Sequence, residues 1–392
     1  MITVAEAKAL IAENIFTLDA VKLPIEKASR HILAEDVFAI ADIPAFRQSS
    51  MDGYAIRFED KDLPLFVHGE MAAGSANALT IKKGETARIF TGAPLPDGAD
   101  TVVMQEKISL NDGRISILDD RLQVGLNVRG IGSEIKASTL AMHKGSFLSP
   151  AAIGFLAGIG ITEISVYPLP TVSIIVTGKE LCAPGETLGF GQVYESNSYS
   201  LKAALEQAGI YKAEVISADD DLEILSRIFE QALKKSDVVL LTGGVSVGDY
   251  DFVLEASRLC KVNQIFHKVK QKPGKPLFFG MKDNKPVFGL PGNPSSVLSC
   301  FYNYVLPALY QMAHKNNPVK EISAKLTDAY HKPAGLTHFL KGTYKDGLAT
   351  PLSAQESFRL SSFAYANCLI CLDEDSDHFE KDTTLNILLI PE

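Results

Sequence analysis

Predicted strands and helices alternate from Pro170 onward, and this alternation constrains the fold more than any other feature of the 392-residue chain. The apolar runs Val172–Val176 and Asp237–Leu241 have the length of buried strands, and the amphipathic segment Leu222–Lys234 has helical periodicity. Strands separated by helices are typical of a parallel sheet with helices on both faces. We therefore predict a three-layer α/β domain with a parallel-rich sheet over residues 169–317.

The flanking segments predict three further domains, so the expected fold class is multidomain α/β. Helical patterns predict a helical linker domain, with one helix opened by a capping box at Thr3–Glu6 and a second from Pro24 to about Glu35. Short β-like runs separated by glycine, proline and aspartate predict an inserted β-rich domain, and similar runs near the end of the chain predict a C-terminal β-barrel. The expected bounds are 1–44 and 136–168 for the helical linker domain, 45–135 for the inserted domain and 318–392 for the barrel.

Composition and charge narrow the class of partner. The net charge of −9 argues against nucleic-acid binding. No apolar run approaches the roughly 20 residues that span a bilayer. Residues 1–14 lack the basic and apolar segments of a signal peptide, and the five cysteines are scattered and odd in number, as expected in a reducing compartment. We therefore expect a cytoplasmic location without membrane or nucleic-acid partners.

Three glycine-containing loops adjoin predicted strands of the α/β domain: TGGVSVGD at 242–249, KPGKP at 272–276 and LPGNPSS at 290–296. Ligands bind such sheets where the carboxyl ends of strands meet the following loops. A glycine-rich turn after a strand can aim backbone N–H groups at an anion, although a plain tight turn explains one such loop equally well. Because three loops converge, we hypothesise a phosphate-bearing ligand. The residues predicted to bind it are Gly243, Gly244, Ser246, Gly248, Pro291, Gly292, Asn293, Pro294 and Ser296.

The second and third loops carry additional binding signals. Lys272 and Lys275 lie in a Pro-Gly-Lys-Pro context that restricts the backbone, so we expect their ammonium groups to face an anion. A run of lysines is otherwise typical of a solvated face, and Lys268 and Lys270 fit that alternative. In the third loop Asn293 is expected at a helix N-cap, followed by proline at the first helical position.

Carboxylates near the glycine loops suggest a Mg²⁺ ion that bridges protein and phosphate. The predicted ligands are Asp251 after the first loop, Glu180 at the end of the first strand, and Asp220 in a run of three aspartates. Each has a simpler alternative. Asp249 and one of the three aspartates can cap helix N-termini, and Glu180 can be an ordinary surface residue.

These loops, together with segments of the inserted domain, match a known family. Ser49–Ala55 (SSMDGYA) and Thr91–Pro94 (TGAP) are glycine turns by local pattern, but their order relative to VVMQE at 102–106, TGKEL at 177–181 and the three loops is highly specific. The chain resembles the molybdopterin molybdenumtransferase family, which inserts molybdenum into molybdopterin, and the E domain of gephyrin. The match runs nearly end to end.

The resemblance implies an α/β molybdopterin-binding domain and an elongated homodimer, whose active site forms between this domain of one subunit and the inserted domain of the other. It implies that adenylylated molybdopterin and molybdate react in a Mg²⁺-dependent cleavage of the phosphoanhydride, releasing AMP and the molybdenum cofactor. Molybdopterin adenylyltransferase would be the upstream partner. The residues expected to be catalytic are Asp52, Thr91, Glu180, Asp251, Lys272 and Lys275, with Asp52 and Thr91 acting in trans opposite the Gly243 loop.

Three positions depart from the family pattern. Lys179 precedes Glu180 where aspartate is usual, and Gly132-Ser133-Glu134 replaces a Gly-Glu-Asp. Lys341 occupies a position commonly filled by arginine, and lysine loses bidentate anion binding. These departures bear on the placement of the substrate more than on the reaction.

Two other functions are compatible with this pattern. The same fold can serve as a non-catalytic molybdopterin-binding scaffold, or the Gly243 loop and Mg²⁺ can serve hydrolysis of another adenylylated metabolite. The charge arrangement of Asp52, Asp251, Lys272 and Lys275 favours catalysis, since a scaffold has no physical need for it.

Overall fold

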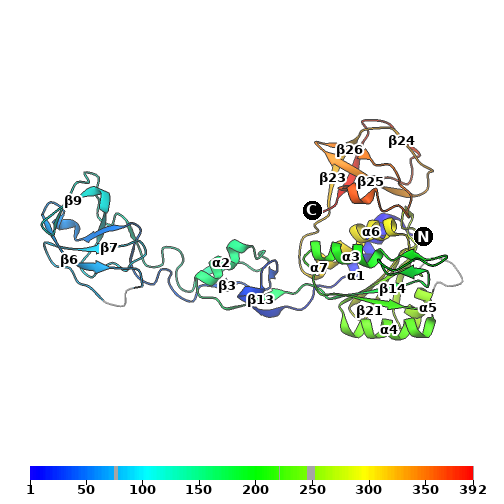
Figure 1. The fold of residues 1–392 in the computed structure, drawn as a ribbon, viewed down its shortest axis with the longest axis horizontal. Coiled ribbons are helices and arrows are strands. Elements are labelled where there is room, and N and C mark those ends of the chain that lie inside the picture. Colours follow the sequence, from blue (N-terminus) through cyan, green and yellow to red (C-terminus); the bar gives the residue numbers. More distant parts are fainter. Residues whose placement is uncertain (75–77, 220, 245–251, 392) are drawn as a thin grey trace. The chain divides into compact units, whose positions relative to one another are not determined.

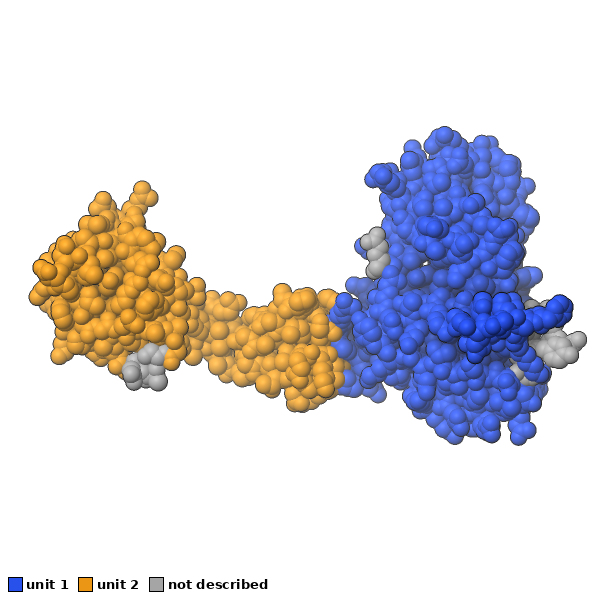
Figure 2. All heavy atoms as spheres, in the orientation of Figure 1, with its two compact units in different colours: residues 1–21, 30–32, 167–392 blue, residues 22–29, 33–166 orange. Residues whose placement is uncertain are grey.

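The computed structural model describes residues 1–74, 78–219, 221–244 and 252–391, and it divides into two compact units (Figure 2). No helix within these ranges is long and apolar enough to cross a membrane. Unit 1 consists of Met1–Val21, Arg30–Ile32 and Tyr167–Glu392, and unit 2 consists of Lys22–Ser29 and Leu33–Val166.

A six-stranded sheet in the order β17-β14-β18-β22-β21-β19 forms the centre of the α/β region of unit 1 (Figure 1). The first four strands are parallel and the last two pair antiparallel, which confirms the predicted parallel-rich sheet. Strand β21 was not predicted from the sequence. A tight turn at Asp283 (φ +53°) connects it to β22, so the two strands are not separated by a helix as the alternating pattern leads one to expect. The strand bounds are β14 Val172–Thr177, β17 Ala213–Ala218, β18 Val238–Thr242, β19 Asn263–His267, β21 Phe278–Lys282 and β22 Lys285–Leu290.

Helices cover both faces of this sheet, because successive side chains on a strand point to opposite faces. Ile174 and Ile175 on β14 are both fully buried, yet they belong to different hydrophobic cores. The Ile174 core includes α1, α3, α6 and α7, and the Ile175 core includes α4 and α5. Figure 1 shows α3 and α4 on opposite sides of the sheet, so the three-layer prediction is confirmed. The helix bounds are α1 Val4–Asn14, α3 Asn197–Gln207, α4 Leu222–Lys235, α5 Phe252–Leu259, α6 Pro294–Cys300 and α7 Leu306–Met312.

The N-terminal helix α1 begins with the predicted capping box. Thr3 Oγ1 accepts a hydrogen bond from the Glu6 N–H at 3.2 Å, and Glu6 Oε2 accepts one from the Thr3 N–H at 2.7 Å. Ala7 and Ile11 of α1 are buried in the same core as Val172. The helix therefore packs on the α/β sheet, although its sequence position suggested the helical linker domain. The apolar stripe of a helix does not specify which surface covers it.

Unit 2 contains a six-stranded sheet in the order β8-β5-β7-β6-β10-β9. Gly53 is required where β5 pairs with β8, because a Cβ at this position would lie 1.9 Å from the Val103 carbonyl oxygen. Gly53 thus begins a strand instead of occupying the turn that its local pattern suggests. The strand bounds are β5 Gly53–Ile56, β6 Leu65–Met71, β7 Glu85–Ile89, β8 Thr101–Met104, β9 Ile108–Asn111 and β10 Arg114–Ile117.

The helix predicted from Pro24 to Glu35 is wrong. Ile25–Lys27 (η1) form only a short 3₁₀ turn, and Ile32–Leu33 (β2) pair with β13 (Glu163–Tyr167). Arg30 has φ +66°, a conformation that a right-handed helix does not contain. Ile32 and Leu33 are buried in this strand instead of on a helix.

The C-terminal strands close into a five-stranded barrel, which confirms the predicted β-barrel. Its strands follow the order β25-β26-β23-β29-β27, and β27 pairs again with β25. A short strand, β20 (Gln271–Lys272), pairs in parallel with β25 and places Lys272 opposite His338. The second glycine loop is therefore attached to the barrel as well as to the α/β domain. The barrel strands are β23 Lys320–Leu326, β25 Thr337–Lys345, β26 Leu348–Pro351, β27 Cys368–Leu372 and β29 Thr384–Leu389.

Candidate active site

A cavity of about 990 Å³ lies between loops of the α/β domain and loops of the barrel, within unit 1. Pockets for small molecules and cofactors typically have volumes of about 300–1,000 Å³. Of the predicted site residues that the structure describes, eight line this cavity: Glu180, Lys272, Lys275, Pro291, Gly292, Asn293, Pro294 and Ser296.

The Pro291–Ser296 loop is held in place from two directions. Asn293 is the N-cap residue of α6 and Pro294 its first helical residue, as predicted. The Asn293 side chain makes no capping bond, however, and its Nδ2 donates to Ser357 Oγ of a barrel loop at 2.8 Å. On the other side, Asn197 Nδ2 of α3 donates to the Gly292 carbonyl oxygen at 2.8 Å. These contacts fix the loop between the α/β domain and the barrel.

The loop that carries Lys272 and Lys275 is supported by a buried polar network. Gln271 Nε2 donates to the Gly274 carbonyl oxygen at 3.0 Å, and Gln271 Oε1 accepts a hydrogen bond from the Tyr304 hydroxyl. Gly274 has φ +87°, and a Cβ there would lie 2.5 Å from the sulfur of Cys300, so only glycine fits. Both lysine side chains are exposed and line the cavity.

The first glycine loop is described only at its beginning. Gly243 and Gly244 have φ values of +87° and +60°, and a Cβ on Gly243 would lie 2.7 Å from the Thr177 carbonyl oxygen. The Gly243 N–H donates to the Leu290 carbonyl oxygen at 3.3 Å, so this donor is engaged by the sheet instead of being aimed at a ligand. Its Cα lies 3.9 Å from a Cβ built on Gly292, which brings the first and third loops together.

Several predicted residues lie outside the described part of the chain. These are Ser246, Gly248, Asp251 and Asp220. Asp221, next to Asp220, caps α4 by accepting from the N–H groups of Glu223 and Ile224 at 3.0 and 2.9 Å, in agreement with the capping alternative.

Glu180 is exposed in the cavity and supplies a carboxylate there. Mg²⁺ is usually bound through one or two carboxylates, with phosphate oxygens and water completing its shell. Among the residues that the structure describes, no group of three metal-binding side chains is present. A donor set of Glu180 with substrate phosphates nevertheless fits the ion, because Mg²⁺ rarely occupies an all-protein cage.

Residues that were not predicted from the sequence also line the cavity, among them Glu195, Gln355, Ser357 and Phe358. Glu195 lines the cavity and accepts hydrogen bonds from the N–H and hydroxyl of Ser198 at the start of α3, a contact that a capping pattern at 195–198 hints at. Gln355, Ser357 and Phe358 come from a barrel loop more than 50 residues away from the glycine loops. Only the folding of the barrel against the α/β domain brings them to this cavity.

In unit 2, the structure brings Asp52 and Thr91 together. Asp52 Oδ1 accepts hydrogen bonds from the Thr91 N–H at 2.7 Å and from its hydroxyl at 2.8 Å. The backbone hydrogen bond from Thr91, followed by its side-chain bond, lowers the pKa of Asp52. The result is an exposed, ionised carboxylate held in one orientation.

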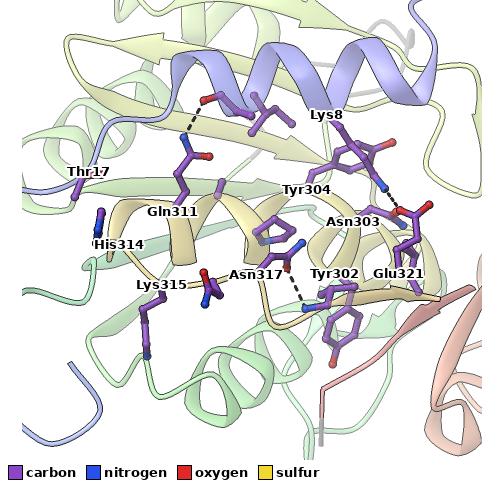
Figure 3. A pocket seen from close by; sticks show the side chains of 17 residues that line it. Lys8, Thr17, Tyr302, Asn303, Tyr304, Gln311, His314, Lys315, Asn317 and Glu321 are labelled. Atoms are coloured by element: carbon purple, nitrogen blue, oxygen red, sulfur yellow. Dashed lines mark hydrogen bonds and ion pairs between the residues drawn. The ribbon is translucent and has the colours of Figure 1, made fainter. Parts of the chain in front are cut away.

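A second cavity, of about 620 Å³, lies between α1, α7 and the start of the barrel (Figure 3). Lys8 approaches Glu321 at 3.8 Å across it, and Gln311 Nε2 donates to the Ala12 carbonyl oxygen at 2.8 Å. Tyr304 lines this cavity, and its hydroxyl donates a hydrogen bond to Gln271 in the loop that carries Lys272 and Lys275. None of the predicted site residues that the structure describes lines it.

Comparison with known proteins identifies the family. Three family models match successive parts of the chain: the MoeA N-terminal region (domain I and II) at residues 2–160, a probable molybdopterin binding domain at 173–311 and the MoeA C-terminal region (domain IV) at 323–390. The molybdopterin molybdenumtransferase of Staphylococcus aureus is 33% identical to this chain, covering 99% of the chain and 95% of that protein. The chain belongs to the molybdopterin molybdenumtransferase family.

Other members of the molybdopterin molybdenumtransferase family agree in sequence and in fold. The enzyme of that name from Haemophilus influenzae is 32% identical over 99% of this chain and 98% of its own. A crystal structure of the molybdopterin biosynthesis moeA protein from Pyrococcus horikoshii has a TM-score of 0.81 and 29% identity, with 100% of both chains covered. The resemblance drawn from the motifs is thus confirmed. The 990 Å³ cavity draws residues from both the molybdopterin-binding and the C-terminal family regions.

Proposed function

We propose that this chain inserts molybdenum from molybdate into adenylylated molybdopterin, with Mg²⁺-dependent release of AMP, in the biosynthesis of the molybdenum cofactor. The observation that carries the proposal is the 990 Å³ cavity, which is lined by Lys272, Lys275 and the Pro291–Ser296 loop. The chain that contains this cavity belongs to the molybdopterin molybdenumtransferase family. Relatives that share nearly the whole chain length are named molybdopterin molybdenumtransferase, which supports the transfer of molybdenum to molybdopterin.

The charges of the cavity suit this chemistry. Adenylylated molybdopterin carries several negative charges and molybdate adds two, so binding both requires fixed positive charge. Lys272 and Lys275 would neutralise phosphate and oxyanion charge, and the loop beneath them is already ordered by Gln271. Mg²⁺, held by Glu180 and by Asp251, which follows the first loop, would supply stabilisation of the departing phosphate.

We further propose that the chain acts as a homodimer, in which Asp52 and Thr91 of one subunit complete the cavity of the other. The support is that the family resemblance points to Asp52 and Thr91, and that Asp52 presents an exposed carboxylate which two hydrogen bonds from Thr91 hold in one orientation. The substrate is already adenylylated, so an adenylyltransferase that acts on molybdopterin would precede this enzyme.

The deciding experiment measures AMP release from adenylylated molybdopterin by the purified protein with Mg²⁺, in the presence and absence of molybdate. We expect molybdate to stimulate AMP release, and Lys272→Ala or Lys275→Ala to reduce it by about 100- to 1,000-fold, the usual effect of removing one electrostatic stabiliser. Lys234→Ala, a change on the exposed face of α4, is the matched control. Tight substrate binding without AMP release would instead support a scaffold role.

A further inference from the structure

The barrel side of the 990 Å³ cavity is formed by a loop at residues 354–360, and this loop presents an aromatic ring. Phe358 lines the cavity with 62% of its surface exposed. Tyr194, which is 47% exposed, lines the same cavity from the α/β domain. Neither ring is needed for core packing, so the cavity contains two accessible aromatic side chains and the two lysines in one space.

The loop that carries Phe358 is held by a buried cation. Lys341 is only 2% exposed, and its Nζ donates to the carbonyl oxygens of Ala354 at 2.7 Å and Arg359 at 2.9 Å, with a longer bond to Glu356 at 3.4 Å. The side chain of Gln355 bonds to both the N–H and the carbonyl oxygen of Lys341, at 3.0 and 2.8 Å. Burying an ammonium group is costly unless its donors are satisfied. These bonds therefore select one conformation of the loop.

The same loop is bound to the Pro291–Ser296 loop. The Ser357 carbonyl oxygen accepts a hydrogen bond from the Ser295 N–H at 3.1 Å, and Ser357 Oγ accepts one from Asn293 Nδ2 at 2.8 Å. Ser357, the residue before Phe358, thus contacts the Pro291–Ser296 loop directly. The Arg359 guanidinium lies 5.9 Å from the centre of the Phe358 ring. The bonds to Lys341 and to the Pro291–Ser296 loop order the backbone that carries the exposed ring, so less conformational entropy is lost when a ligand stacks on it.

We propose that Phe358 is a specificity-determining residue whose ring stacks on a planar nitrogen heterocycle of the substrate, and that Lys341 positions it. This inference rests on the proposed function, because adenylylated molybdopterin carries two such heterocycles, a pterin and an adenine. Both offer the flat π surface that an exposed phenyl ring binds. Direct binding of AMP and of a free pterin, neopterin, distinguishes the two.

The experiment titrates AMP, neopterin and molybdate separately into the full-length wild-type protein and its variants by calorimetry. We expect Phe358→Ala to weaken binding of one heterocycle by about 5- to 100-fold, the range for loss of one aromatic stacking contact. Phe358→Tyr should retain most of the affinity because it keeps the ring. Molybdate affinity and the unfolding midpoint of Phe358→Ala should match those of the wild type. Phe190→Ala is the control, since Phe190 is exposed in the same unit but does not line the cavity.

Equal affinity of wild type and Phe358→Ala for both AMP and neopterin would overturn the inference. So would a loss that extends equally to molybdate, because it would indicate a general disturbance of the cavity. The AMP-release assay separates this test from that of the proposed function. If wild type does not turn over but Phe358→Ala still loses heterocycle affinity, the proposed function fails and the stacking role stands. If Phe358→Ala turns over with unchanged KM and binds both probes normally, the stacking role alone fails.

Discussion

At the scale of single residues, Lys341 shows how a charge can have a role that its sequence position does not indicate. Its place in the family pattern suggested a weaker substitute for an anion-binding arginine. In the structure its Nζ is buried and donates to backbone carbonyl oxygens of the 354–360 loop. Burial lowers its pKa from the usual value, with the nearby carboxylate of Glu356 acting in the opposite direction. Lys341 thus orders the wall of the cavity instead of contacting an anion.

Replacing Lys341 by methionine should therefore destabilise the protein. The change keeps the aliphatic stem but removes the Nζ donor of the Arg359 carbonyl oxygen, and it leaves the Ala354 carbonyl oxygen with the Ser362 hydroxyl alone. An unsatisfied polar group away from water costs roughly 1–3 kcal/mol. Urea unfolding followed by circular dichroism measures the loss. Lys345→Met on the same strand is the control, because Lys345 is exposed. Equal stability of the two variants would contradict the role assigned to Lys341.

A second residue-scale prediction concerns pH. His338 is buried opposite Lys272, and burial, followed by the charges of Lys272 and Lys332, lowers its pKa to about 4 from 6.5. The unfolded chain binds a proton at His338 more readily than the folded protein between these pH values. Stability should therefore fall as pH decreases from 6.5 towards 4, with His338 contributing about 3 kcal/mol of that loss at 1.36 kcal/mol per pKa unit.

The variant His338→Gln tests this contribution. Unfolding free energies of wild type and variant are measured between pH 4 and 7, and the difference between the two curves isolates His338 from the carboxylates that also titrate in acid. We expect the variant to lose less stability than the wild type over this range. Parallel curves would show that His338 is protonated equally easily in the folded and unfolded states.

At the scale of elements, the helical segment from Pro294 to Met312 connects the 990 Å³ and the 620 Å³ cavities of unit 1. Its middle, Phe301–Val305, is a π-helical turn, a feature that is frequent at functional sites. Tyr304, within this turn, lines the 620 Å³ cavity. Its hydroxyl donates a hydrogen bond to Gln271, which supports the loop that carries Lys272 and Lys275. Burial raises the pKa of Tyr304, so its hydroxyl stays a hydrogen-bond donor.

The variant Tyr304→Phe should weaken the support of the loop that carries Lys272 and Lys275 without creating a cavity in the core. Gln271 Oε1 loses its donor, and a buried acceptor without a partner costs roughly 1–3 kcal/mol. We expect lower stability and a higher KM for the substrate. Tyr310→Phe is the matched control, because the Tyr310 hydroxyl donates to the Ala208 carbonyl oxygen at 3.2 Å, away from the loop. An unchanged KM together with reduced stability would restrict Tyr304 to a structural role.

At the scale of the whole molecule, the candidate residues fall in two separate units. Lys272 and Lys275 belong to unit 1, and Asp52 and Thr91 belong to unit 2. The proposed homodimer makes both necessary for one active site, with unit 2 of the partner subunit completing unit 1. The oligomeric state and the origin of each residue are therefore testable together.

Complementation between inactive variants tests this arrangement. Asp52→Asn and Lys272→Ala are each expected to abolish most turnover as homodimers. When they are co-expressed and purified as a mixed dimer, one of the two cavities contains no substitution, so part of the AMP-release activity should return. Failure to recover any activity, or elution of the wild type as a stable monomer in size-exclusion chromatography, would reject the shared site.

Local patterns in the sequence were sufficient for features that depend on near neighbours. The capping box at Thr3 and Glu6, the start of α6 at Pro294 and the apolar strands β14 and β18 all follow from side-chain chemistry within a few residues. Spacing among several such motifs was sufficient to identify the family. The predicted helix at Pro24–Glu35 failed because the positive φ of Arg30 and the pairing of β2 with β13 override helical periodicity.

Contacts between distant segments depend on the folded chain. Lys272 reaches His338 through strand pairing with the barrel, Asn293 reaches Ser357 across a domain boundary, and Lys341 holds the loop of Phe358. Packing energy between domains decides these contacts, and the periodicity of a segment carries no information about the surface it will meet. The sequence thus indicates the chemical groups and the loops that hold them, whereas the walls of the cavity and the ring at its edge follow from how the barrel packs on the α/β domain.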